Sequence, residues 1–288
     1  KLLQSFLMIR IALYVGDSTG LKILKDYINK KFIITYVVST DKKYEMVVKK
    51  ICNQNIIKFF FIDEIKNQLS SRYNKKTDAI ISIFSRYIFP KKFIKNYKGY
   101  IFNMHPGLLP FYPGTNSISG TLYNHEKYTG STIHLVTNKI DGGDIVLSKK
   151  FKLKKNDLAM TVWQKIQKIS LLLARNFYKK VSDDKLIFKK NNTNKSKIFP
   201  KFIPNNGIIK PNLDDLSKVL TLYRASYYYP FKSPWGNLKI LYKKKLLTIN
   251  NIKRVNSEYY ICKDIKKINS KIYLVKLMAN KIIQVKIN

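Results

Sequence analysis

Cysteine and long apolar runs are scarce in this chain of 288 residues. The two cysteines, Cys52 and Cys262, lie far apart in the sequence and cannot build a disulfide framework, which excludes a small disulfide-stapled secreted scaffold. No apolar run approaches the roughly 20 residues that a membrane-spanning helix requires, and residues 1–7 are too short for a signal peptide. We therefore expect a cytoplasmic protein with no membrane partner, whose fold begins near Met8.

Acidic residues are also few. The chain has 17 Asp and Glu against 55 Lys and Arg, and its formal net charge is +38. A balance this basic is typical of proteins that bind nucleic acid or another anionic surface. A second explanation stays open, because only six of the basic residues are arginine and Lys, Asn, Ile and Tyr are abundant, as an A+T-rich coding sequence would produce. Outside a denser stretch at 179–201, the basic residues are scattered along the chain.

Glycine and proline number only eleven and nine, and 45% of the residues are hydrophobic, which excludes a disordered protein. Short apolar segments alternate with helical patterns through the first half of the chain. The predicted strands are residues 9–15, 32–38, 59–62, 79–84 and 100–102, with helical patterns at 21–28, 44–52 and 65–69 between them. This alternation predicts parallel βαβ units and an α/β fold with an open, mostly parallel, Rossmann-like sheet.

Ligands bind such sheets at the carboxyl ends of the strands. We therefore expect the functional residues among 16–20, 85–90 and 103–114. Residues 16–20 are glycine-rich but lack the spacing of a dinucleotide-binding turn, and we interpret them as a tight turn between strand and helix.

The second half of the chain predicts a smaller β domain. Two strands at 131–136 and 146–151 and a long amphipathic helix at 158–181 complete a first domain at 8–182, and a polar linker or crossover follows at 183–206. After a helix at 213–226, five short strands predict a C-terminal β-barrel-like domain at 207–288. These strands are residues 238–242, 246–249, 259–262, 272–276 and 282–287.

One loop carries an amide and an imidazole where a sheet presents its ligands. Residues 103–114 read Asn-Met-His-Pro-Gly-Leu-Leu-Pro-Phe-Tyr-Pro-Gly and come directly after a predicted strand. Taken alone, Asn103 and His105 could be catalytic or could simply shape a turn.

Two further segments change that balance. Residues 129–134 read Thr-Gly-Ser-Thr-Ile-His, and residues 141–144 read Asp-Gly-Gly-Asp. In order and in spacing, the three segments resemble the formyltetrahydrofolate-dependent formyltransferases, which include the methionyl-tRNA, glycinamide ribonucleotide and sugar-nucleotide enzymes. The resemblance covers about residues 8–150. Residues 204–209 and 222–241 resemble more weakly the start of the C-terminal barrel of the methionyl-tRNA and aminoarabinose-type members.

The resemblance implies a catalytic trio and a co-substrate, 10-formyltetrahydrofolate. Asn103 and His105 would donate hydrogen bonds to the oxyanion that develops during formyl transfer. Asp141 would relay protons and orient His105. The residues implied in binding the folate follow the strand before Asn103, together with the second carboxylate of Asp-Gly-Gly-Asp: Ser85, Arg86, Tyr87, Ile88, Phe89, Pro90 and Asp144.

The acceptor is implied less clearly, because the sequence departs from the family pattern beside it. Beside the acceptor, Gly107 replaces a common Ser, whereas Arg86, which stands where many members carry Gly, implies a different entry to the folate pocket. The acceptor-side loop, Gly114, Thr115 and Asn116, continues into Ser117, where the methionyl-tRNA enzymes have Gly-Ala-Ala-Pro. The Asn116 side chain could bind an acceptor or could cap a helix at 118–123.

We accordingly predict an enzyme of one-carbon metabolism that formylates methionyl-tRNA for translation initiation. The alternatives are transfer to an amino-sugar nucleotide, transfer to water, and a catalytically inactive folate- or RNA-binding homologue. We expect no metal, because His105, His125 and His134 are the only histidines and no His/Cys pair has ligand spacing. A phosphate-binding P-loop is absent from the sequence as well.

Overall fold

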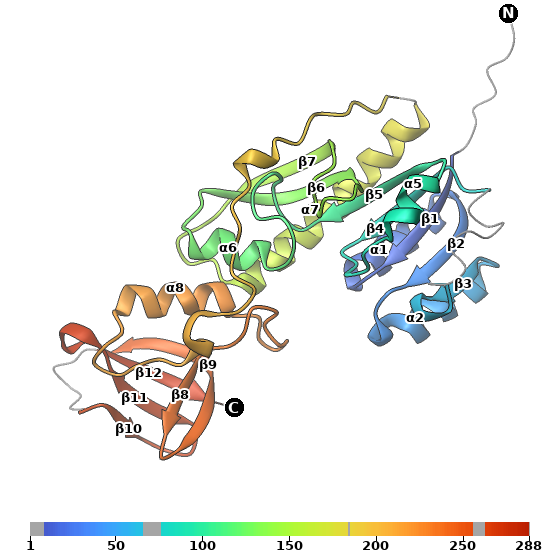
Figure 1. The fold of residues 1–288 in the computed structure, drawn as a ribbon. Helices are drawn as coiled ribbons and strands as arrows, with labels where there is room; N and C mark the ends of the chain where they lie inside the picture. The colour runs from blue at the N-terminus through green and yellow to red at the C-terminus, as the bar shows by residue number, and fades with distance from the viewer. Residues whose placement is uncertain (1–8, 66–75, 184, 256–262, 288) are drawn as a thin grey trace, which may run out of the picture. The chain divides into compact units, whose positions relative to one another are not determined.

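The computed structural model describes residues 9–65, 76–183, 185–255 and 263–287, and Figure 1 shows its elements. The chain folds into two compact units. Unit 1 comprises Lys1–Gly114, Gly130–Phe151 and Lys165–Lys197, and unit 2 comprises Thr115–Thr129, Lys152–Gln164 and Ile198–Asn288. The predicted linker, 183–206, is therefore divided between the units after Lys197. No helix among the described residues is long and apolar enough to cross a membrane.

Unit 1 is built on a seven-stranded sheet in the order β3-β2-β1-β4-β5-β6-β7. The first five strands pair in parallel, and β6 pairs antiparallel with β5. The strands are β1 (Arg10–Val15), β2 (Ile33–Ser39), β3 (Lys58–Phe61), β4 (Ala79–Ile83), β5 (Tyr100–His105), β6 (Tyr128–Leu135) and β7 (Ile145–Lys152). The helices of unit 1 between them are α1 (Ser18–Asn29), α2 (Lys42–Gln54), α3 (Ile62–Ile65) and α5 (Lys91–Asn96), whereas α6 (Ser117–Tyr123), between β5 and β6 in the sequence, belongs to unit 2.

Helices pack on both faces of this sheet. Alternate residues of its buried strands point to opposite sides, so apolar side chains on both faces need to be covered. On one face Leu13 and Val15 pack in a core with α1, α2 and the later turns of α7 (Ala159–Ser182). On the other face Tyr14 packs in a separate core with α3 and α5. The Tyr27 hydroxyl of α1 donates a hydrogen bond of 2.9 Å to the main-chain oxygen of Ala174 in α7, which joins the first helix to the last of the layer.

The strand order changes direction between β1 and β4. From β1 the chain moves outward through β2 to β3, and it then returns to β4 on the other side of β1 before continuing to β5. Such a switch point leaves a crevice at the carboxyl ends of its two central strands. Gly16, directly after β1, approaches the chain after β4 so closely that a Cβ here would overlap the main chain of Phe84 and Ser85.

Unit 2 contains a five-stranded antiparallel half-barrel in the order β10-β11-β12-β9-β8. Its strands are β8 (Lys239–Tyr242), β9 (Lys245–Val255), β10 (Ile265–Lys267), β11 (Ile272–Lys276) and β12 (Ile282–Ile287), preceded by α8 (Leu216–Ser226). Lys243 and Lys244 form the tight turn between β8 and β9, with φ angles of 47° and 65°. Trp235 is fully buried against the rings of Tyr123 and Phe199, which holds α6 in this unit.

The predicted fold class is confirmed: an open, mostly parallel α/β sheet accompanies a small antiparallel β domain. Two strands are longer than predicted. The strand expected at 100–102 continues to His105, and the strand expected at 246–249 extends over Lys245–Val255, because pairing with neighbours prolongs both beyond their apolar segments. The strand predicted at 259–262 lies outside the described residues, as does most of the helical pattern at 65–69.

We expect Gly130→Ala to destabilise the protein by about 3 kcal/mol. A Cβ at Gly130, in β6, would overlap the main-chain oxygen of Lys149 in β7 and press on Leu108. Gly114→Ala is the control, because nothing lies within 4 Å of its added carbon and only its φ of 78° opposes the change, at about 1–2 kcal/mol. Urea denaturation measures both variants, and an equal loss would contradict the proposed overlap.

Candidate active site

Two of the predicted catalytic residues lie on one strand. Asn103 and His105 belong to the last residues of β5, not to a loop after it, and their side chains share a face because they are two positions apart. The antiparallel register of β6 sets His134 opposite Asn103 and Thr132 opposite His105. This edge of the sheet therefore collects two imidazoles and an amide.

Asp141 joins these side chains from the loop between β6 and β7. Its Oδ2 atom lies 3.2 Å from His105 Nδ1 and accepts a hydrogen bond of 2.7 Å from the N–H of Gly114. Its Oδ1 atom lies 3.2 Å from His134 Nε2 and accepts a hydrogen bond of 3.3 Å from Asn103 Nδ2. The structure thus brings the predicted trio together around one carboxylate.

Hydroxyl groups of the Thr-Gly-Ser-Thr segment fix the chain that follows His105. Thr132 Oγ1 donates to the Gly107 carbonyl at 2.7 Å and accepts from the Leu109 N–H at 3.2 Å. Ser131 Oγ donates to the main-chain oxygen of His105 at 3.2 Å. These side chains are buried. Their hydroxyls therefore serve as hydrogen-bond partners for main-chain groups that water does not reach.

The electrostatics of the site favour an ionised Asp141 beside a neutral His105. Burial alone would raise the pKa of the Asp141 carboxyl, but the facing His105 and His134 and the N–H of Gly114 hold that pKa well below its ordinary value. Burial lowers the pKa of His105, and the negative charge of Asp141 opposes this only in part. An anionic carboxylate, an amide and an imidazole can together stabilise developing charge and move a proton.

The second nitrogen of His105 is occupied by the protein itself. His105 Nε2 lies 3.1 Å from the main-chain oxygen of Tyr112, and the imidazole is only 3% exposed. Tyr112 is itself buried, with a left-handed φ of 51°. Donation from this nitrogen to a ligand therefore requires the Tyr112 carbonyl to give up its contact.

His134 is the site residue that the sequence interpretation missed, because it was weighed only as a metal ligand. Its Nδ1 lies 2.7 Å from the main-chain oxygen of Leu135, and its Nε2 lies 3.2 Å from Asn103 Nδ2 as well as near Asp141. The signal in the sequence is alternation: in Ser-Thr-Ile-His, His134 falls on the same strand face as Thr132. Only the register with β5 shows that this places it opposite Asn103.

The segment predicted to bind folate follows β4 at the switch point. Arg86 and Ile88 are exposed, and the Tyr87 N–H donates to Ser85 Oγ at 3.0 Å. Phe89 is a core residue, 4% exposed. Because β4 pairs in parallel with β5, this segment begins at the same sheet edge as the trio; its last residue, Pro90, directly precedes α5.

The remaining predicted residues have protein partners of their own. The Asp144 carboxylate accepts a hydrogen bond of 3.4 Å from the Asn191 N–H. Asn116 precedes α6 but makes no side-chain cap, so the capping interpretation is wrong; its Nδ2 donates to the Lys201 carbonyl at 3.0 Å. Thr115, next to it, is exposed. His125 faces Thr221 Oγ1 at 3.4 Å in unit 2, and no group of three metal-ligating side chains occurs among the described residues.

Comparison with known proteins gives one family and several relatives. The family model described as formyl transferase matches residues 30–172. A methionyl-tRNA formyltransferase of Prochlorococcus marinus is 30% identical over 224 residues, which cover 74% of this chain and 63% of that protein. A GDP-perosamine N-formyltransferase of Brucella melitensis is 28% identical over 167 residues, which cover 58% of this chain and 62% of that protein. The chain thus spans less than two thirds of these relatives.

A solved structure supports the fold over nearly the whole chain. The N-formyltransferase of Helicobacter canadensis, in complex with folinic acid and dTDP-3-aminofucose, has a TM-score of 0.69 and 16% sequence identity. The likeness covers 98% of this chain and 100% of that one.

We expect His105 to titrate below the ordinary imidazole pKa of 6.5, so that it is neutral at pH 7. Asp141→Asn should lower the pKa of His105 further, because the variant removes the negative charge that opposes the effect of burial. Nitrogen-15 NMR measures this directly, since the chain has three histidines and His105→Gln identifies the signal. A His105 that titrates above 6.5, or a rise in Asp141→Asn, would contradict the assignment.

Proposed function

We propose that the protein transfers a formyl group from 10-formyltetrahydrofolate to an acceptor amine, because the formyl transferase family model matches residues 30–172. The observation that carries the proposal is the convergence of Asn103 and His105 on the largely buried carboxylate of Asp141. An inactive folate- or RNA-binding homologue would have no need to keep all three side chains in contact. Transfer to water would use the same trio and is tested by the assay below.

Formyl transfer forms a bond from the acceptor nitrogen to the formyl carbon and breaks the bond from that carbon to N10 of the folate. The carbonyl oxygen becomes an oxyanion between these two events. Asn103 Nδ2 carries a second hydrogen besides the one directed at Asp141, and it can donate to that oxygen. His105 Nε2 can donate too once it leaves the Tyr112 carbonyl, in the neutral tautomer that carries its proton on Nε2.

Protons must also move, because the attacking amine loses one and the departing folate nitrogen gains one. Asp141 is the one group of the trio that is ionised at neutral pH, so it can accept the amine proton through water. The contacts to His105, Gly114 and Asn103 hold its oxygens in place while it does so.

The folate is proposed to bind against residues 85–90. Their place at the carboxyl end of β4, beside the switch point, is where open α/β sheets bind ligands. The exposed Arg86 and Ile88 leave part of the segment free for contact. The solved N-formyltransferase of similar fold holds folinic acid, which supports a folate as the ligand.

Methionyl-tRNA is the first proposed acceptor. Residues 198–288 contain 18 Lys and Arg against 4 Asp and Glu, and Lys243, Lys244 and Lys245 are exposed together at one hairpin. A polyanion is the ligand that such a surface attracts. The methionyl-tRNA formyltransferase relative supports the same choice.

A nucleotide-linked amino sugar is the second candidate. The solved N-formyltransferase that holds dTDP-3-aminofucose matches this chain along its full length. The acceptor-side loop of Gly114, Thr115 and Asn116 also lacks the residues typical of the methionyl-tRNA enzymes. Both observations are compatible with a smaller acceptor.

We expect Asp141→Asn and His105→Ala each to lower formyl transfer by at least about 10²-fold while folate binding survives, because both groups act mainly on the transition state. Asn103→Ala should lower it less. The assay follows loss of the formyl group from 10-formyltetrahydrofolate with methionyl-tRNA, with dTDP-3-aminofucose and with buffer alone, and His125→Gln serves as control. Near-normal turnover in either of the first two variants would remove the trio from the mechanism.

Salt dependence distinguishes the two acceptors. With methionyl-tRNA, log affinity should fall steeply with log salt, by close to one unit of slope for each phosphate contacted, whereas a sugar nucleotide should give a shallow slope. Replacing Lys243 and Lys244 by Asn, which tolerates their left-handed backbone, should reduce the slope for tRNA and leave transfer to the sugar nucleotide unchanged. An unaltered slope would remove this hairpin from tRNA binding.

A further inference from the structure

A polar segment that follows α7 runs alongside the loop that carries Asp141. We name residues 189–195 the 189–195 strap. Lys189 exchanges two main-chain hydrogen bonds of 2.8 Å with Ile145, at the start of β7. Further along, Thr193 Oγ1 accepts a hydrogen bond of 2.7 Å from Lys139 Nζ. The strap is therefore fastened on both sides of Asp141, and all of these residues belong to unit 1.

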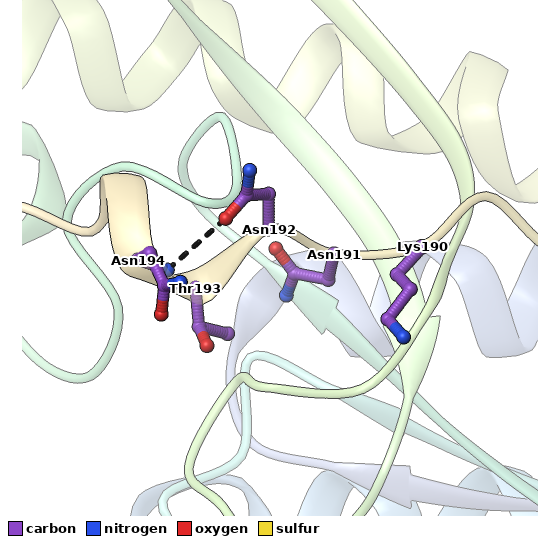
Figure 2. Close-up of a pocket in the computed structure, with 5 residues that line it drawn as sticks. All are labelled: Lys190, Asn191, Asn192, Thr193 and Asn194. Carbon is purple, nitrogen blue, oxygen red and sulfur yellow. Dashed lines mark hydrogen bonds between the residues drawn. The ribbon is translucent and has the colours of Figure 1, made fainter.

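Asn191 makes the central contact of the strap. Its Nδ2 donates a hydrogen bond of 2.8 Å to the main-chain oxygen of Asp141, and its N–H donates to Asp144. The side chains of Asn191 and Asn192 leave the strap in different directions, and Asn192 turns back to accept from the Asn194 N–H (Figure 2). Asn191 is 6% exposed, whereas Asn192 is exposed.

The other end of the Asn191 amide is unusual. Its Oδ1 is buried and has no hydrogen-bond partner within the part of the chain that the structure describes. A buried, unpaired amide oxygen destabilises a fold, so an apolar side chain would be favoured here unless the amide were needed. The hydrogen bond to Asp141 is the contact that an apolar side chain could not supply.

Asp141 needs such a contact because its backbone is strained. Its φ of 47° lies in the left-handed region, which a residue with a Cβ adopts only when its surroundings hold it there. Gly114, Asn103, His105 and His134 hold the carboxylate, but none of these contacts fixes the main chain from which it projects.

We propose that Asn191 is a positioning residue for formyl transfer: by holding the main-chain carbonyl of Asp141, it keeps the Asp141 carboxylate aligned with His105 and Asn103. The proposal rests on the function proposed above. Asn191 acts through Asp141 and touches no reacting atom. A misplacement of a catalytic group by about 1 Å can cost about 10²-fold in rate, so loss of this one hydrogen bond should be measurable.

The test replaces the amide Nδ2 by a carboxylate oxygen at each of two neighbouring residues, Asn191 and Asn192. Asn191→Asp replaces the donor with an oxygen that faces the Asp141 carbonyl, with almost no change in size. Asn192→Asp introduces the same charge one residue away and keeps the oxygen that accepts from Asn194. Asn191→Gln retains a donor and is the rescue variant, and Asp141→Asn gives the full effect of losing the carboxylate.

We expect Asn191→Asp to lower kcat by about 10²-fold with little change in KM for 10-formyltetrahydrofolate. Asn191→Gln should recover much of this loss, and Asn192→Asp should behave as the unaltered protein. The nitrogen-15 signals of His105 and His134 should move in Asn191→Asp toward their positions in Asp141→Asn, which a loss of stability without displacement of Asp141 would not produce.

Two results would overturn the proposal: full kcat with unmoved histidine signals in Asn191→Asp, or a folded Asn191→Gln that is as impaired as Asn191→Asp. Failure of the proposed function has a different signature. In that case the unaltered protein would show no formyl transfer, or Asp141→Asn would leave the transfer unchanged, while the histidine signals would still report whether Asn191 holds Asp141 in place.

Discussion

The largely buried negative charge of Asp141 organises the candidate active site of unit 1. A carboxylate removed from water is strongly destabilising unless charges and hydrogen-bond donors compensate it. The partners of Asp141 come from β5, from β6 and from the end of the loop after β5, so these three parts of the chain must be assembled before the charge is satisfied. The same requirement explains why a left-handed, strained residue is tolerated at this position.

The sheet supplies the frame for that assembly. The parallel strands β4 and β5 end at one edge, and the switch point between β1 and β4, the place where open α/β sheets bind ligands, lies beside them. The antiparallel β6 then brings a second imidazole to the same edge. Paired strands of the sheet thus fix the positions of Asn103, His105 and His134, and of these four site residues only Asp141 depends on a loop.

Local patterns of the sequence predicted much of this arrangement. Alternating apolar and helical segments predicted the α/β sheet, and the family resemblance carried by residues 103–114, 129–134 and 141–144 implied the trio that the structure brings together. His134 was missed because its place beside Asn103 depends on strand register, which periodicity does not contain. Asn191 was missed because its surroundings are polar and rich in Lys and Asn, which predicts a linker. Its contact with Asp141 spans 50 residues of sequence.

The interleaving of the two units has a consequence for how this protein can be divided. Thr115–Thr129 and Lys152–Gln164 interrupt unit 1 in the sequence but belong to unit 2, where the Met160 N–H donates to the Tyr227 carbonyl and Arg224 donates to that of Asp157. No single cut in the polypeptide separates the units, and removal of residues 198–288 would strip these two segments of their partners. Residues 198–288 therefore do not make up unit 2 alone. A fusion or a domain exchange that retains the C-terminal half-barrel must also include Thr115–Thr129 and Lys152–Gln164.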